Sequence, residues 1–170
     1  MNSTSIKMKI AYIMSRFPKH TETFILYEML AIEEQGVSVE VYPLLKQRDT
    51  VVHREAHVLV ERAHYMPFIS IPIISSNIAA IRRNAALYFS ALIEVLKGTF
   101  GNTNFLIGAI SVFPKAVHFS KMMTEEGITH VHAHFSNHPA IAALIVHRLT
   151  GIPFSFTAHG HDIHKDRTML

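Results

Sequence analysis

Hydrophobic residues in the first part of the chain follow the spacing of a strand, then that of a helix, then that of a strand again. Apolar residues run almost continuously through 9–14 and alternate with polar ones through 37–42. These are patterns of strands in a covered sheet. The segment between them has helical spacing, with Thr21 as its expected N-cap and Gly36 as its end. The expected stripe of this helix is Phe24, Ile25, Glu28, Met29 and Ile32. Strand, helix and strand in this order predict a right-handed βαβ unit with parallel neighbouring strands, the second closed by Pro43.

The middle of the chain is dominated by helical spacing. Long helices are predicted over 73–96 and 104–125, as an insertion in the alternation of strands and helices. The stripe expected to face the core in the first of them is Ile74, Ile78, Ile81, Ala85, Tyr88, Leu92 and Val95. We interpret this stripe as core packing in preference to a membrane-surface helix.

The remaining pattern completes an α/β fold. The expected elements are a short helix over 54–62, a short strand over 63–67, a strand over 128–134, a helix over 139–149 and a strand over 153–158. Neither a repeat nor a linker divides the chain. The sequence therefore predicts one domain over 1–170, a Rossmann-like parallel sheet with helices on both faces and a helical insertion.

Composition narrows the class of protein. Hydrophobic residues make up 49% and charged residues 17%, which indicates a folded globular chain. Cysteine is absent, so disulfides and thiolate metal sites are excluded. The net charge of +3 comes from scattered residues, which argues against a nucleic-acid partner and is compatible with an anionic membrane surface. Arg82 and Arg83 interrupt the best candidate for a membrane span. We expect a cytoplasmic protein that can lie on the membrane.

Candidate chemistry gathers where the predicted strands end. Eight of the thirteen histidines lie between His130 and His164, beside the last two strands. Ligands of an open parallel sheet bind beyond the carboxyl ends of its strands. The turn after the first strand contains no glycine, which argues against a nicotinamide site. Arg16 and Lys19 in that turn are suited to hold an anion.

Three histidines with a spacing of two share one face of the predicted strand. Together with His159 and His161, the residues His130, His132 and His134 suggest a zinc site. The metal-hydrolase pattern His-x-His-x-Asp-His is not met, however, because the aspartate directly follows His161. We therefore favour partly buried strand histidines with satisfied nitrogens over a metal site.

The segment that follows the last strand has its own candidates. His159 is the first polar side chain past the strand, where an imidazole can bond a hydroxyl and stabilise developing charge. Gly160 permits a tight turn or the close approach of a ligand. Asp162 can orient a histidine or cap a helix, and we leave both roles open.

Three segments resemble a known family. They are 16–24, with Arg-Phe-Pro-Lys-His-Thr-Glu-Thr-Phe, 130–135, with His-Val-His-Ala-His-Phe, and 151–162, with Gly-Ile-Pro-Phe-Ser-Phe-Thr-Ala-His-Gly-His-Asp. In these the chain resembles the N-terminal domain of retaining glycosyltransferases of family 4, with GT-B architecture. The resemblance is to the bacterial exopolysaccharide, colanic-acid and lipopolysaccharide type.

The resemblance implies a domain that binds the acceptor, a saccharide or a lipid-linked saccharide at the cytoplasmic membrane face. The donor, a nucleotide-sugar, is bound mainly by a second domain, and neither a metal nor another cofactor is required. The resemblance makes His159 the catalytic residue. The substrate-binding residues that it implies are Arg16, Lys19, His20, Thr21, Glu22, His134, Gly160, His161 and Asp162.

The donor-binding domain of that family has no counterpart in these 170 residues. We therefore expect a fragment that is inactive alone and is completed by a second domain in cis or on a separate chain. Two other hypotheses remain. One is a histidine-ligated metal-dependent hydrolase, and the other is a non-catalytic module that binds a sugar or a partner.

Overall fold

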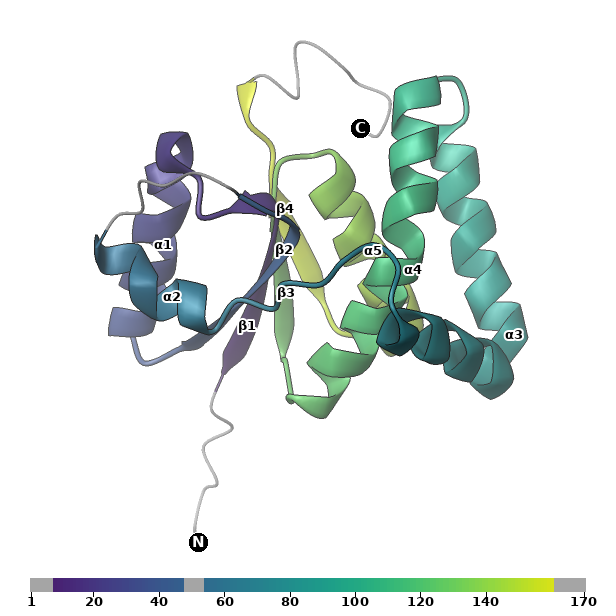
Figure 1. Ribbon diagram of the computed structural model, residues 1–170, viewed down its shortest axis with the longest axis horizontal. Coiled ribbons are helices and arrows are strands. Elements are labelled where there is room, and N and C mark those ends of the chain that lie inside the picture. The colour runs from purple at the N-terminus through teal and green to yellow at the C-terminus, as the bar shows by residue number, and fades with distance from the viewer. Residues whose placement is uncertain (1–7, 48–53, 161–170) are drawn as a thin grey trace, which may run out of the picture.

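Four parallel strands form a single sheet in this protein. The computed structural model describes residues 8–47 and 54–160, with the backbone alone at His20 and Arg54. The strands are β1 (Lys9–Phe17), β2 (Ser38–Lys46), β3 (His130–His134) and β4 (Phe154–Thr157). Their order in the sheet is β2-β1-β3-β4, with every neighbouring pair parallel (Figure 1). The predicted parallel α/β fold of Rossmann-like type is confirmed.

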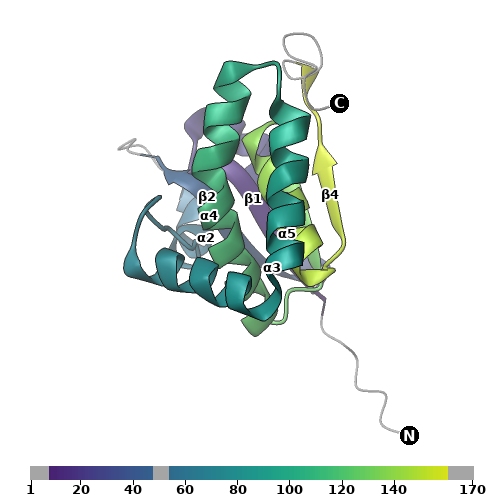
Figure 2. The same ribbon diagram turned by 90° about the vertical axis from the view of Figure 1, so that its right-hand side faces the viewer.

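Helices cover both faces of the sheet. They are α1 (Thr23–Glu34), α2 (His57–Glu61), α3 (Ile71–Thr99), α4 (Thr103–Glu125) and α5 (His138–Thr150), with 3-10 turns at His20–Glu22 and Arg54–Ala56. Tyr12 and Met14 of β1 pack with residues of α1 and α2, whereas Ala11 and Ile13 pack with residues of α3, α4 and α5. Figure 2 views the molecule from the side of α3 and α4, with β4 at the edge of the sheet. In the described part of the chain, no helix has the length and apolar character needed to cross a membrane.

Strands β1 and β2 both extend beyond their predicted ends. The expectation that Pro43 closes β2 is wrong, because Pro43 pairs with Met14 inside the strand. Val41, two residues earlier, points its carbonyl away from β1 and accepts a hydrogen bond from the His64 amide at 2.8 Å. Pro43 has the same orientation, so its missing N–H lies on the outer side of an edge strand, where proline is tolerated. The strand predicted over 63–67 is reduced to one bridge, between Val41 and Ala63.

The start of α1 also differs from the prediction. A 3-10 turn at His20–Glu22 precedes the helix, and Glu22 rather than Thr21 is the N-cap residue. No side chain caps either element. The Thr21 prediction fails because the chain already turns before the α-helix begins, which places Thr21 inside the 3-10 turn.

Helix α3 consists of two segments that meet at Asn84. Asn84 has extended φ and ψ angles of −159° and 88°, and its Oδ1 accepts a hydrogen bond from the Leu87 amide at 2.9 Å. Asn84 therefore acts as the N-cap of the second segment. The break changes the helical phase, so Ile74 and Ile78 are each 51% exposed while Tyr88 is buried. The core stripe predicted for α3 is correct at Ile81, Tyr88, Leu92 and Val95 and wrong at Ile74, Ile78 and Ala85, which are exposed.

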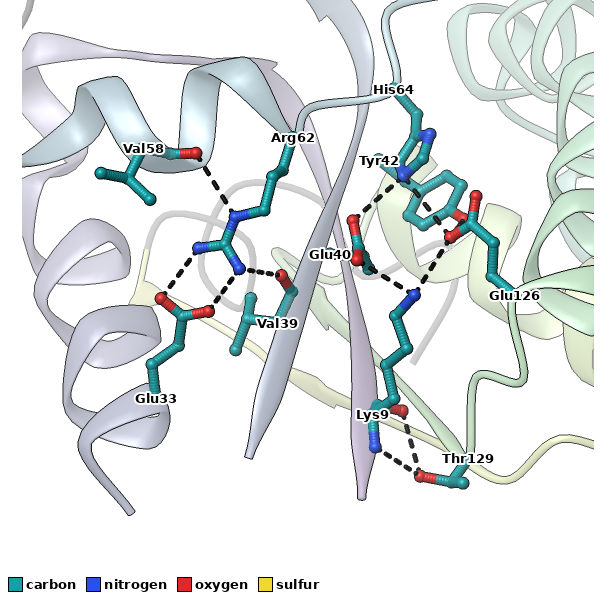
Figure 3. Close-up of polar contacts among 10 residues, drawn as sticks. All are labelled: Lys9, Glu33, Val39, Glu40, Tyr42, Val58, Arg62, His64, Glu126 and Thr129. Atoms are coloured by element: carbon teal, nitrogen blue, oxygen red, sulfur yellow. Dashed lines mark hydrogen bonds and ion pairs between the residues drawn. The ribbon is translucent and has the colours of Figure 1, made fainter. Parts of the chain in front are cut away.

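A polar network joins α4 to the amino-terminal ends of β1 and β2 (Figure 3). Lys9 Nζ lies 3.0 Å from Glu40 Oε1 and 3.7 Å from Glu126 Oε2, just past the end of α4. The Tyr42 hydroxyl donates to Glu126 Oε2 at 2.8 Å, and the Tyr42 ring stacks on His64. These contacts hold the amino-terminal edge of the sheet together, opposite the edge that carries the candidate site.

Candidate functional site

The carboxyl-terminal edge of the sheet brings together the ends of strands that are far apart in sequence. Arg16 lies near the end of β1, His134 is the last residue of β3, and His159 follows β4 by two residues. Because the strand order is β2-β1-β3-β4, these residues follow one another along the edge. This is the edge at which ligands of parallel sheets bind.

His134 is the buried centre of a group of rings. Its side chain has no exposed surface, and its ring stacks with Tyr12 at a centroid distance of 5.8 Å and with His159 at 5.7 Å. The nitrogens His134 Nδ1 and His159 Nε2 are 3.4 Å apart. Phe24 and Phe135 lie against the His159 ring, with centroids at 5.0 and 4.6 Å. His159 is thus held in position by aromatic contacts on more than one side.

Burial controls the protonation of the strand histidines. Desolvation lowers the pKa of His134 to about 4, although the nearby Glu28 carboxylate acts in the opposite direction. Burial also lowers the pKa values of His132 and His130. Neutral imidazoles therefore line this part of the sheet at pH 7.

Hydroxyl groups of β4 partner the two histidines on the same face. Ser155 Oγ lies 2.8 Å from both His130 Nε2 and His132 Nδ1. His132 Nε2 also lies 3.2 Å from Thr157 Oγ1. These contacts agree with the expectation that His130 and His132 are strand residues with satisfied nitrogens.

Glu28 of α1 lies beside His132 and His134, and sequence reasoning did not propose it as a site residue. Its Oε1 accepts a hydrogen bond from the Tyr12 hydroxyl at 2.9 Å. The same atom lies 3.4 Å from His134 Nε2 and 3.9 Å from His132 Nε2. The available signal was a glutamate within the otherwise largely apolar stripe that α1 turns toward the sheet.

A cavity of about 1050 Å³ opens where β1 and β2 end. Its lining residues are Arg16, Leu44, Leu45, Lys46, Gln47, Tyr65, Met66, Pro67 and Phe68. Arg16 and Lys46 supply positive charge beside an apolar wall, an arrangement suited to an anionic group on a larger ligand. Burial raises the pKa of Tyr65 to about 12, so its hydroxyl remains a donor, directed to the Phe17 carbonyl at 3.2 Å.

The other residues predicted for the first turn have different surroundings from those of Arg16. Lys19 Nζ is 2.5 Å from Glu22 Oε1, so these two side chains pair with each other. Thr21 is exposed beside them. The His20 side chain, His161 and Asp162 lie outside the described part of the structure.

Gly160 is the last residue that the structure describes. Among the described residues, a Cβ at Gly160 would meet no atom within 4 Å, and the φ of Gly160 lies outside the left-handed region. The tight turn and the ligand approach predicted at Gly160 both stay predictions, because the residues that follow Gly160 lie outside the described part of the chain.

Phe135 adopts a left-handed backbone conformation directly after β3, with φ of 76°. This region is rarely occupied by a bulky side chain and costs about 1–2 kcal/mol. The same residue places its ring against His159. Backbone strain therefore coincides with the residue that supports His159, as is common at functional sites.

Comparison with known proteins found no matching family model, no matching curated protein and no matching solved structure.

Proposed function

We propose that this chain is the acceptor-binding domain of a retaining glycosyltransferase with GT-B architecture, acting in the assembly of a surface polysaccharide. The supporting observation is that one edge of the sheet carries a cationic cavity beside β1 and β2 and the imidazole of His159 beyond β4. The three sequence segments that resemble glycosyltransferase family 4 include Arg16, His134 and His159.

His159 is proposed to contact the transferred sugar or the acceptor hydroxyl. An imidazole can accept or donate a hydrogen bond there and stabilise charge that develops during transfer. Phe24, 45% exposed, offers an apolar ring beside His159. A sugar ring has both apolar and hydroxyl-bearing surface, so a site with aromatic and imidazole groups suits it.

The cavity is proposed to hold the phosphate-bearing part of a lipid-linked acceptor. Arg16 and Lys46 provide the cations, and an arginine can bind two phosphate oxygens at once. A second domain, in cis or on a separate chain, would bind the nucleotide-sugar. The acceptor would place the enzyme at the cytoplasmic face of the membrane.

Transfer by the complete enzyme tests the proposal. We expect transfer from a nucleotide-sugar to a lipid-linked saccharide, measured with a radiolabelled donor. His159→Ala should lower kcat by roughly a hundredfold or more, which is the usual contribution of a positioned acid–base group. His57→Ala is the matched control, because His57 is exposed on α2 and lies outside the described site.

The assignment of His159 fails if His159→Ala retains wild-type transfer. Saturable saccharide binding without transfer, even with the second domain supplied, would indicate a binding module instead. Hydrolysis that depends on an added metal would indicate a metal-dependent hydrolase.

A further inference from the structure

We infer that Glu28, His132 and His134 form a binding site for one zinc ion between α1 and the sheet. One ligand atom of each residue lies within 4.8 Å of those of the other two. Glu28 Oε1 lies 3.4 Å from His134 Nε2 and 3.9 Å from His132 Nε2. Two imidazole nitrogens and a carboxylate oxygen are a common zinc ligand set. The inference does not depend on the proposed glycosyl transfer, because the resemblance implies an enzyme that needs no metal.

One of the distances between the ligand atoms matches that around a tetrahedral ion. With zinc bonds of about 2.0–2.1 Å, neighbouring ligand atoms lie about 3.3 Å apart. Glu28 Oε1 and His134 Nε2 are 3.4 Å apart. The separation of Glu28 Oε1 from His132 Nε2 is 3.9 Å, so these two atoms would have to approach each other by about 0.6 Å to reach that spacing.

Hydroxyl groups that contact Glu28 and His132 are placed to orient these two ligands. The Tyr12 hydroxyl donates to Glu28 Oε1 at 2.9 Å, and this oxygen keeps a second lone pair for a metal. His132 Nδ1 can donate to Ser155 Oγ at 2.8 Å, which leaves Nε2 with its lone pair. Such outer contacts fix the ring and tautomer of metal-binding histidines. Thr157 Oγ1, 3.2 Å from His132 Nε2, is a hydroxyl that the ion would displace or take as its fourth ligand.

The site is buried at His134 and partly exposed at Glu28 and His132. Among the described residues, the buried His134 Nε2 has no hydrogen-bond partner, which is costly for a polar atom in an interior. The Glu28 side chain is 39% exposed and that of His132 is 16% exposed, so an ion can enter past them. A bound metal would satisfy the buried nitrogen of His134.

A second group of possible metal ligands differs from this site in its positively charged neighbour. Glu40, His64 and Glu126 also lie close enough to share an ion. The Lys9 ammonium already sits 3.0 Å from Glu40 and 3.7 Å from Glu126 and compensates their charge (Figure 3). Within the described residues, no lysine or arginine forms an ion pair with Glu28. We therefore place the zinc site at Glu28.

Zinc titration of the chelator-treated 170-residue chain tests the inference. Isothermal calorimetry should show one zinc per chain, and Glu28→Gln and His132→Gln should each weaken binding by about tenfold or more. Glu28→Gln keeps an oxygen that can accept the hydrogen bond from the Tyr12 hydroxyl while removing the negative charge. His130→Gln, on the same strand face, and Glu40→Gln, in the second cluster, are matched controls that should bind zinc like wild type.

Cobalt substitution supplies an independent readout. We expect the intense visible absorption of tetrahedral cobalt in wild type and its loss in Glu28→Gln, with circular dichroism confirming that each variant is folded. Absence of stoichiometric zinc in wild type would overturn the inference, as would equal affinity in Glu28→Gln and His130→Gln. Weakened binding in Glu40→Gln alone would place the ion at the other cluster and would equally refute it.

Discussion

Lys115 in the middle of α4 is fully buried, and its ammonium contacts carbonyl groups in place of a carboxylate. Nζ donates to the Leu44 carbonyl at 2.5 Å and to the Met66 carbonyl at 2.6 Å. The rings of Phe68 and Phe119 lie nearby, with Nζ 5.0 and 5.6 Å from their centroids. Lys115 therefore joins α4 to the end of β2 and to the segment that lines the cavity.

Desolvation lowers the pKa of Lys115 from 10.5 to about 8. This difference corresponds to about 3 kcal/mol of unfolding free energy. Between these two values the unfolded chain binds more protons than the folded chain, so stability rises with pH. The gain is complete above the unfolded pKa and is lost progressively as pH falls from there to the folded pKa. Between pH 7 and about pH 9.5 the lysine should contribute a gain of about 2 kcal/mol.

Lys115→Met removes this gain while keeping an unbranched side chain of similar length. At pH 7 the variant loses the cost of a buried charge but leaves the Leu44 and Met66 carbonyls without their donor, at about 1–3 kcal/mol each. Because these effects oppose each other, the pH dependence is more diagnostic than the stability at one pH. Tyrosine ionisation is common to both proteins and cancels in the difference.

Urea unfolding followed by circular dichroism, from pH 7 to about pH 9.5, measures the effect. The stability of wild type minus that of Lys115→Met should rise by about 2 kcal/mol across this range. Lys121→Met, which removes an exposed lysine of the same helix that pairs with Glu125, is the matched control for the loss of a positive charge. Parallel pH profiles for wild type and Lys115→Met would refute the reasoning.

Three further predictions concern backbone and packing. A Cβ at Gly108 would lie 1.8 Å from His138 Nε2, so Gly108→Ala should destabilise by about 1–3 kcal/mol in thermal unfolding. In a His138→Ala background the same change should be neutral or stabilising, and an unchanged cost there would contradict the clash. Phe135→Gly should be about 1 kcal/mol more stable than Phe135→Ala in urea, because only glycine relieves the left-handed strain; equal stabilities would argue against it. Asn84→Ala should cost about 1 kcal/mol and Asn84→Asp much less, since aspartate also caps; equal losses would exclude a capping role.

Much of the fold follows from local pattern. The strands at 9–14, 37–42 and 128–134 and both long helices were predicted within a few residues of their ends, because hydrophobic period is a local property. The errors in these predictions lie where tertiary contacts override local signals. Pro43 is accommodated only because β2 is an edge strand, and the expected face of α3 changes because Asn84 restarts the helix.

The sequence by itself determined the order of strands and helices, and with it the edge of the sheet where His134 and His159 meet. Parallel topology carries that inference, since each helix returns the chain to the same side. Only the tertiary structure placed Glu28 beside His134 and buried Lys115 against two carbonyls. Such contacts join elements distant in sequence. Their geometry depends on how helices pack on the sheet, which no local period encodes.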